Sequence, residues 1–336
     1  MKALYFLLTL FIFISCTKEK FVKAEIKLSE IDSLDTNNKV EEFIGKTDSL
    51  YRKFSLKKVQ DIKCLGCDTV LVNLANRLKA DYAFFRADLD NNGYTDLVAT
   101  GVNKTYTSGN YDPNLLVEFS KDFNALVLMN FGKDKIKLYN LTDGLYNGII
   151  PTLEYIENRP FLTIYKPRHI HTIERLKREE LKTELTFKFD AFVEYNPEPI
   201  SYKIEKIEYS TTGCMGMCPI FLLSVNNDGT ATFEATEYNY TEDFQMGKLL
   251  TGTFTATVPS KELNELKDLL NYIDFVNLKN RYDVLWTDDQ TAILKITYNN
   301  GKTKTITDYG LKGTYGLIKL HDLIFKMRIN QGWTKN

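Results

Sequence analysis

Histidine, tryptophan and proline are scarce in this chain of 336 residues, which contains three His, two Trp and eight Pro. None of the histidines lies in a recognisable nucleophile–histidine motif, so no motif indicates a hydrolase, although catalytic residues need not be neighbours in sequence. With few prolines and no low-complexity tract, extended disorder is not expected beyond the N-terminal segment. The lack of a catalytic motif favours a protein that is not an enzyme and leaves the question open.

The chain also lacks an excess of charge of either sign. It has 43 Lys and Arg against 44 Asp and Glu. Nucleic-acid-binding domains carry a basic excess, so a nucleic-acid partner is not expected. Its composition, 43% hydrophobic and 26% charged, is that of a globular protein. The length suggests two domains.

Long hydrophobic runs are missing except at the N-terminus. Lys2 precedes an apolar run over residues 3–14, which is too short to span a bilayer because a spanning helix needs about 20 residues. A basic start, a short apolar run and the small residue Ser15 before Cys16 are typical of a signal peptide. The segment Phe13-Ile14-Ser15-Cys16 resembles a lipobox, at which a signal peptidase cleaves before an acylated cysteine. The alternative is a plain secretory signal with an incidental cysteine.

The lipobox resemblance implies that acyl chains of the palmitate type on Cys16 hold the mature chain to a membrane. Each buried methylene contributes about 0.8 kcal/mol, so two or three chains anchor it essentially permanently. Thr17 departs from the aspartate that retains Gram-negative lipoproteins in the inner membrane, and Lys18-Glu19 is similar to an export tag of surface lipoproteins. We predict a signal peptide over residues 1–15, an acylated stem over 16–36, and an outer-membrane location on the periplasmic or surface face.

Aromatic and β-branched residues are abundant, with 20 Tyr and 21 Phe, and they alternate with polar residues over much of the chain. Such runs predict strands, and here they follow one another as hairpins, which is typical of an α+β fold. We predict two domains, each a mainly antiparallel sheet with one or two packed helices, over residues 37–195 and 201–333. The prolines of Asn196-Pro197-Glu198-Pro199 mark the boundary, because proline cannot donate to a strand ladder.

The spacing of apolar residues predicts the individual elements and distinguishes helices from strands. In the first domain they are helices over 38–54 and, after Asp68, over 69–79, with strands over 96–102, 124–129, 135–139, 160–165 and 184–194. In the second they are strands over 203–209, 220–225, 230–236, 254–258, 291–298 and 302–307, and helices over 261–273, capped by Ser260, and 315–329. The pairs Asp228-Gly229 and Asn300-Gly301 predict tight hairpin turns.

The segment Asp88-Leu89-Asp90-Asn91-Asn92-Gly93-Tyr94-Thr95-Asp96 has oxygen donors at its positions 1, 3, 5 and 9 and glycine at position 6. This spacing is that of the front part of a calcium loop, in which glycine permits the sharp turn. An EF-hand would carry a glutamate at position 12, where this chain has Ala99 within a predicted strand. The segment is therefore not an EF-hand.

The same segment resembles the D-x-D-x-[DN]-G-x-x-D loop of integrin-type β-propeller repeats, which binds calcium between two strands. The motif occurs once, whereas a propeller needs several copies, so we infer the loop without the propeller. The resemblance implies a structural calcium ion bound by the side chains of Asp88, Asp90, Asn92 and Asp96 and the carbonyl of Tyr94. A Kd of about 10⁻⁴ to 10⁻³ M is expected. The alternative is an Asx-stabilised turn without a metal.

Besides Cys16 the chain has four cysteines, in the close pairs Cys64/Cys67 and Cys214/Cys218. An even number in an oxidising compartment favours disulfides, with three possible pairings. Bridges between the two sites would stabilise more than local ones, roughly 5 against about 2 kcal/mol. The pairs fall in different predicted domains, so we expect local bridges. A thiol–disulfide redox role for Cys64 and Cys67, before a predicted helix N-terminus, is the alternative function, and a four-cysteine zinc site is a further possibility.

The second cysteine pair lies in the segment Gly213-Cys214-Met215-Gly216-Met217-Cys218-Pro219-Ile220-Phe221. This segment resembles the G-x-C-x-G-x-C-P-x-[YF] signature of an uncharacterised bacterial family, a domain of unknown function that is common in lipoproteins, except that Gly213 directly precedes Cys214. The resemblance runs from about residue 202 to residue 333. It implies an α+β domain and supplies no activity.

Two of the three histidines, in His169-Ile170-His171, would lie on one face of a strand. The nearby Lys166, Arg168 and Arg175 would repel a cation, so a solvated face is expected. His321 stands beside the buried stripe of the last predicted helix and is assigned no role. The sequence thus predicts a membrane-anchored, non-enzymatic binding or structural protein whose ligand it does not reveal.

Overall fold

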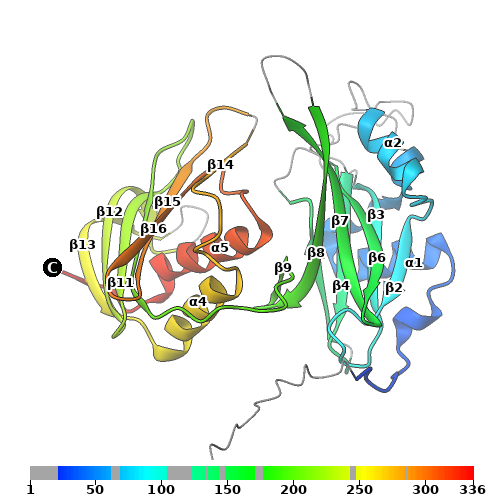
Figure 1. Cartoon of the computed structure of the whole chain (residues 1–336), viewed down its shortest axis with the longest axis horizontal. Coiled ribbons are helices and arrows are strands. Elements are labelled where there is room, and N and C mark those ends of the chain that lie inside the picture. The colour runs from blue at the N-terminus through cyan, green and yellow to red at the C-terminus, as the bar shows by residue number, and fades with distance from the viewer. Residues whose placement is uncertain are drawn as a thin grey trace, which may run out of the picture.

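The computed structural model describes residues 22–61, 69–103, 123–133, 135–143, 148–170, 177–242, 247–284 and 286–336. Within these ranges three sheets and four α-helices are present (Figure 1). Almost all neighbouring strands are antiparallel, and the chain has the α+β fold that the sequence predicts. The predicted Cys16 anchor, the Cys64/Cys67 pair, Asp68 and His171 lie outside the described residues.

The N-terminal half contains the elements up to β9. They are α1 (Asn37–Thr47), β1 (Phe54–Leu56), α2 (Thr69–Arg77), β2 (Phe84–Ala87), β3 (Asp96–Asn103), β4 (Phe123–Asn130), β5 (Ile136–Asn140), β6 (Ile150–Ile156), β7 (Arg159–Ile170), β8 (Lys177–Lys188) and β9 (Ala191–Glu194). Short 3₁₀ turns cover Glu30–Ser33, Ser49–Tyr51 and Val59–Asp61.

The C-terminal half follows from β10 onward. Its elements are β10 (Ile204–Thr211), β11 (Ile220–Asn226), β12 (Thr230–Tyr240), β13 (Leu249–Thr257), α4 (Ser260–Tyr272), β14 (Arg281–Asp283), β15 (Thr291–Tyr298), β16 (Lys302–Tyr309), α5 (Tyr315–Asn330) and β17 (Thr334–Lys335). The short strands β1, β2, β14 and β17, and the longer β6, were not among the predicted elements.

Two sheets pack against each other in the N-terminal half. One has the order β1-β3-β4-β5, with β2 also paired to β3, and the other has the order β6-β7-β8-β9. A single hydrophobic cluster joins Val98 and Val127 of the first sheet to Leu162 and Ile164 of the second. Helix α1 covers the opposite face of the first sheet. Strands β3 and β4 are buried along their whole length because both of their faces are covered.

Helix α1 is shorter than the helix predicted over residues 38–54. It ends at Thr47 because Asp48 has an extended backbone (φ −140°, ψ 120°) and its carboxylate accepts the N–H of Leu50, which starts a 3₁₀ turn. Phe54 begins β1 instead of ending the helix. The apolar face of the helix packs inward, since Val40, Phe43 and Ile44 are buried.

The predicted strand over residues 184–194 is a hairpin. Strand β8 ends at Lys188 and β9 begins at Ala191, and the intervening Phe189 and Asp190 have φ angles of 57° and 55°. A two-residue hairpin turn needs left-handed backbone at both of its central residues, and Asn-Gly or Asp-Gly usually occupies these positions. The turn was missed because neither residue is glycine or asparagine. The Asp190 carboxylate accepts the Tyr139 hydroxyl at 2.6 Å.

Residues 22–36, expected to belong to the stem, lie partly against the folded body. Ile31 and Leu34 are buried in the cluster beneath α1. Before them, an isolated parallel bridge pairs Lys27 with Tyr94. The folded N-terminal half therefore includes residues that were predicted to belong to the stem.

The C-terminal half is one sheet of order β14-β16-β15-β10-β11-β12-β13-β17, with α4 and α5 on one face (Figure 1). Helix and sheet share one core, in which Phe221 and Phe233 meet Leu266 and Leu320. The predicted turns are confirmed: Gly229 and Gly301 have φ angles of 88° and 84°, each between paired strands.

Helix α4 begins one residue earlier than predicted. Ser260 is its first residue, and the N-cap position is taken by Pro259, which makes no side-chain cap. Ser260 is therefore not the cap that the sequence suggested. Leu263, Leu266 and Leu270 of this helix are buried. Among the helices of the described ranges, none is long and apolar enough to cross a bilayer.

The two halves meet where α5 contacts β9. The Glu194 carboxylate at the end of β9 accepts the backbone N–H groups of Tyr315 at 2.7 Å and Gly316 at 2.9 Å. The first N–H groups of a helix have no partner within it, and a negative charge there is favoured by the helix dipole. A residue of the N-terminal half thus caps the last helix of the C-terminal half.

Candidate metal centre

The predicted calcium loop connects the antiparallel strands β2 and β3, in which Ala87 pairs with Asp96. Two positions of the loop require left-handed backbone, Asn91 with φ 60° and Gly93 with φ 88°. Asparagine and glycine are the residues that adopt this conformation at least cost. Local sequence therefore explains why the chain turns sharply between the two strands.

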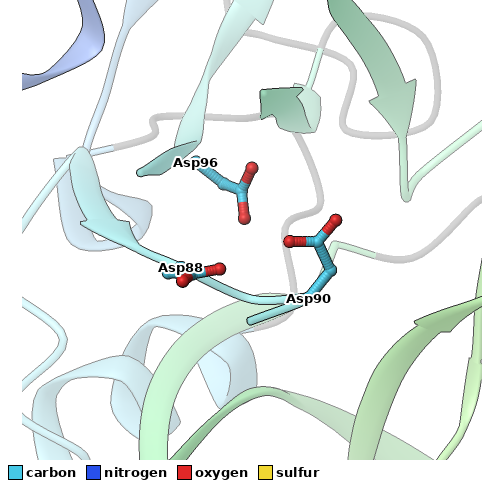
Figure 2. Close-up of side chains that lie close together, drawn as sticks. All are labelled: Asp88, Asp90 and Asp96. Atoms are coloured by element: carbon cyan, nitrogen blue, oxygen red, sulfur yellow. The ribbon is translucent and has the colours of Figure 1, made fainter. Parts of the chain in front are cut away.

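Three carboxylates converge in this loop. Asp88 and Asp90 come from the turn and Asp96 from the first position of β3, and Figure 2 shows their carboxylates pointing toward a common space. One oxygen from each lies within 4.8 Å of the others. Of the five predicted ligands, the structure brings these three together.

The turn is stabilised by its own backbone. The two Asp88 oxygens accept the N–H groups of Asn92 at 3.0 Å and Gly93 at 2.8 Å. The Asn92 side chain donates to Asp90 at 3.1 Å, and its oxygen accepts the N–H of Tyr94 at 2.7 Å. The bond from the Tyr94 N–H to the side chain of Asn92, two residues earlier, is that of an Asx turn, which was the alternative to a metal site.

Asp96 has a different environment, because it is fully buried. Its two oxygens accept the N–H of Leu89 at 2.8 Å and of Asn130, at the end of β4, at 2.7 Å. A carboxylate has about four lone-pair sites, so two N–H groups leave room for a further ligand. Asp96 is held facing the turn by bonds from two other segments.

The electrostatics of the three carboxylates are unfavourable without a cation. Burial, together with the charges of Asp90 and Asp88, raises the pKa of Asp96 to about 8 against the lowering effect of the backbone N–H groups. Burial, together with the charge of Asp88, also raises the pKa of Asp90 to about 6. A divalent cation would offset this repulsion. The donor set is oxygen only, which suits calcium and other hard cations.

The N-terminal segment lies directly on this loop. The Lys27 N–H donates to the Gly93 carbonyl at 2.8 Å, and the Asn91 side chain bonds the carbonyl of Val22 at 3.0 Å and the N–H of Ala24 at 2.9 Å. The approach is close enough that a Cβ on Gly93 would lie 2.3 Å from the Glu25 carbonyl oxygen. Nothing in the loop sequence predicted this partner.

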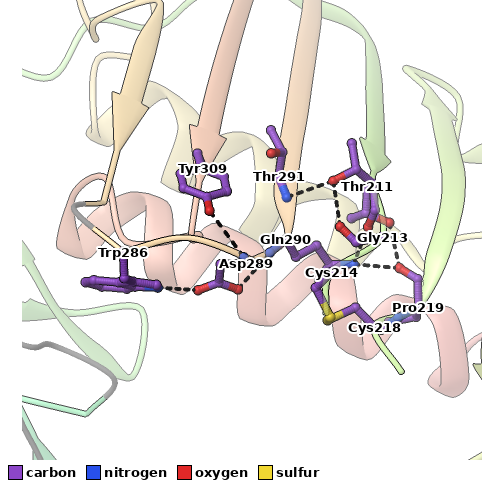
Figure 3. The surroundings of a disulfide bond; sticks show 11 residues. Thr211, Gly213, Cys214, Cys218, Pro219, Trp286, Asp289, Gln290, Thr291 and Tyr309 are labelled. Carbon is purple, nitrogen blue, oxygen red and sulfur yellow. Dashed lines mark hydrogen bonds between the residues drawn. A yellow bond between two sulfur atoms is a disulfide. The ribbon is translucent and has the colours of Figure 1, made fainter. Parts of the chain in front are cut away.

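The second pair of cysteines forms the local disulfide that was expected. Cys214 and Cys218 are bonded, with Cα atoms 5.7 Å apart (Figure 3). The buried Gln290 closes the base of the loop, because its side-chain amide donates to the carbonyls of Thr212 at 3.0 Å and Pro219 at 2.8 Å. Met215 within the loop is 84% exposed.

A buried polar chain near α5 was not predicted. His321 Nδ1 lies 2.8 Å from the Tyr209 hydroxyl, and its Nε2 lies 2.9 Å from the Asp308 carboxylate. A carboxylate only accepts, so Nε2 donates to Asp308, and a neutral imidazole would then accept the Tyr209 hydroxyl at Nδ1. Burial raises the pKa of Tyr209 well above its usual range, so the hydroxyl keeps its proton. The packing of α5 on the sheet brings His321 to Tyr209 across 112 positions, and no local pattern could show it.

The remaining predicted histidine pair is only partly described. His169 lies in β7, near the end of that strand. Its predicted partner His171 falls outside the described part of the chain. The expected solvated face at this position stays a prediction.

Residues 205–328 match the model of a family described as a domain of unknown function (DUF6438). The match runs from β10 into α5 and includes both the disulfide loop and His321. No curated protein and no solved structure matches the chain significantly. The C-terminal part of the chain is therefore similar to a family of unknown function, as its cysteine motif indicated, and the match assigns no activity.

Proposed function

We propose that this chain is a lipid-anchored protein of the cell envelope that binds a structural calcium ion in its N-terminal half and has a binding or structural role. The anchor proposal rests on the lipobox at Cys16 and the apolar run before it. We propose an outer-membrane location, on the periplasmic or surface face, which is supported by Thr17 in place of the aspartate that retains lipoproteins in the inner membrane.

The calcium proposal rests on one observation, the approach of the three carboxylates to within 4.8 Å. An Asx turn needs the carboxylates of the turn only, as in Asp88 and Asp90. It does not need Asp96, a buried carboxyl group that is oriented toward them from the neighbouring strand. An ionised third carboxylate buried beside two others destabilises the protein unless a proton or a cation neutralises it. Asp88, Asp90 and Asp96 would hold the ion, with Asn92 and the Tyr94 carbonyl as the remaining predicted ligands.

The test is a calcium titration of chelator-treated protein, followed by thermal unfolding and calorimetry. Binding with a Kd of about 10⁻⁴ to 10⁻³ M is expected, and calcium at 100 times Kd should stabilise the fold by about 2.7 kcal/mol. Asp90→Asn should weaken binding by at least about tenfold, because it removes one charged ligand.

The matched control is Asp228→Asn. Asp228 stands in the β11–β12 turn and accepts the Thr230 N–H at 2.9 Å, so it is a turn aspartate outside the cluster. It should leave the calcium response unchanged. A wild-type chain whose unfolding temperature ignores calcium would leave the Asx turn as the explanation of the loop.

The alternative function, thiol–disulfide exchange by Cys64 and Cys67, has one structural observation in its favour. Helix α2 begins at Thr69, two residues after Cys67, and a helix N-terminus lowers the pKa of a nearby thiol. A redox titration separates the two functions. A Cys64–Cys67 couple near about −200 mV supports exchange chemistry, whereas a potential below about −300 mV indicates a structural bridge.

A further inference from the structure

Residues 22–28 alternate strictly between apolar and charged side chains. Val22, Ala24, Ile26 and Leu28 stand at even positions, and Lys23, Glu25 and Lys27 stand between them. In a globular protein the apolar set of such a segment normally faces the core and the charged set faces water.

The structure does not follow this arrangement, because the apolar set does not face the core. Val22, Ile26 and Leu28 are 77%, 62% and 83% exposed. By contrast, Lys27 contacts the body, with its ammonium 2.9 Å from the Asn92 carbonyl and 4.9 Å from the centre of the Tyr94 ring. The charged Lys23, Glu25 and Lys27 are exposed as well, so the segment buries neither set and leaves three of its four apolar side chains in solvent.

This exposure does not arise from a loose tail. Backbone bonds fix the segment at three points: Lys27 N–H to the Gly93 carbonyl, and the Val22 carbonyl and Ala24 N–H to the Asn91 side chain. Exposed apolar side chains held in a defined orientation mark an interaction surface with a protein or a membrane.

We propose that Val22, Ile26 and Leu28 contact the lipid surface to which the chain is anchored, and so hold the folded body against the membrane. This inference rests on the proposed acylation of Cys16. Five residues, 17–21, separate Cys16 from Val22, and a fully extended chain covers at most about 3.6 Å per residue. Val22 therefore stays within about 20 Å of the anchoring cysteine.

A lipid surface fits this segment better than a second protein does. The membrane is the one apolar surface that an anchored chain always has within reach. Residues 17–28 also contain four lysines and two glutamates, and a basic excess next to a membrane is attracted by anionic headgroups. Aliphatic side chains with lysines beside them are the usual composition of a segment lying in the interface.

The experiment replaces Leu28 with tryptophan in the acylated chain and reconstitutes it in vesicles of phosphatidylethanolamine and phosphatidylglycerol with brominated acyl chains. Bromine quenches tryptophan only at short range, and the signal of the parent chain is subtracted. The matched control is Leu249→Trp, since Leu249 is 56% exposed on β13 of the C-terminal sheet. Quenching of Trp emission in Leu28→Trp should exceed that in Leu249→Trp by about twofold or more. Equal quenching in the two variants, or none in either, would overturn the inference.

A second preparation separates this inference from the anchor proposal. In this preparation the chain from residue 17 onward carries an N-terminal histidine tag and is tethered to vesicles that contain a nickel-chelating lipid. Separately, mass spectrometry of the first preparation reports whether Cys16 is acylated. An unacylated Cys16 contradicts the anchor, while selective quenching in the tethered Leu28→Trp chain still supports the lipid contact. Absence of selective quenching in both preparations contradicts the contact whatever the state of Cys16. A change in Leu28→Trp emission that needs no vesicles and rises with protein concentration would assign the surface to a second copy of the chain.

Discussion

At the scale of single residues, Gly93 carries the closest contact between the N-terminal segment and the metal loop. Its φ is 88°, and a Cβ would lie 2.3 Å from the Glu25 carbonyl oxygen. Gly93→Ala should lower the free energy of unfolding by about 2 to 3 kcal/mol in urea denaturation, from backbone strain and from displacement of the segment. Gly301→Ala is the control, because Gly301 has φ 84° with nothing within 4 Å of its Cβ. Equal losses in both variants would mean that contact with Glu25 contributes nothing.

The buried carboxylates predict how calcium-free protein responds to pH. The pKa values of Asp90 and Asp96, about 6 and about 8, lie above the ordinary aspartate value of 3.8. The folded chain therefore binds these protons more tightly than the unfolded chain, so their stabilising effect is complete below pH 4 and is lost as pH rises through 6 and 8. Calcium replaces the protons, and should raise the unfolding temperature more at pH 8 than at pH 5. A calcium effect that is larger at pH 5 would contradict this.

Sequence reasoning reached the residues of the loop but not those of the polar core. Asp88, Asp90 and Asp96 could be predicted because their spacing is local and the chemistry of calcium dictates it. The link from Tyr209 to His321 could not, since it depends on how α5 packs on the sheet. The same limit applies to Lys27, whose partner is 65 residues away.

At the scale of elements, prediction succeeded where turns have their own chemical signal. The hairpins at Asp228-Gly229 and Asn300-Gly301 were identified because glycine supplies the left-handed backbone. Phe189 and Asp190 also have positive φ angles, but their turn contains no glycine. Both residues continue the apolar–polar alternation of the flanking strands, so the sequence does not mark the turn. Helix α1 was extended too far, because Leu50 and Phe54 fit the helical period although Asp48 ends the helix.

The loop between β10 and β11 is held closed by the Cys214–Cys218 disulfide and by the hydrogen bonds of Gln290. A bridge that closes five residues should contribute about 2 kcal/mol by loop-closure entropy. Replacing Cys214 and Cys218 together by serine should lower the free energy of unfolding by that amount, measured in urea. Gln290 would still hold Thr212 and Pro219, so the strands should remain paired. A loss well above about 4 kcal/mol would show that the bridge organises more than its own loop.

At the scale of the whole molecule, Glu194 is placed to couple the two halves. Its carboxylate caps α5 from β9, while Asn196 just after it donates to the Tyr272 carbonyl at 2.7 Å. Both tryptophans, Trp286 and Trp333, belong to the C-terminal half. Tryptophan fluorescence therefore reports the unfolding of one half, and far-ultraviolet circular dichroism reports both.

Glu194→Ala should separate these two signals. Loss of a helix cap costs about 0.5 to 2 kcal/mol, and here the loss falls on the C-terminal half alone. We expect the fluorescence transition to move to lower urea concentration, while the dichroism transition broadens toward two steps. Glu198→Ala provides the control, because Glu198 is exposed in the connecting segment and should shift neither signal by more than about 0.5 kcal/mol. If the fluorescence and dichroism transitions of Glu194→Ala move together, the two halves unfold as one cooperative unit. The remaining contacts between β9 and α5 would then be enough to couple the halves, and the cap would stabilise the molecule as a whole.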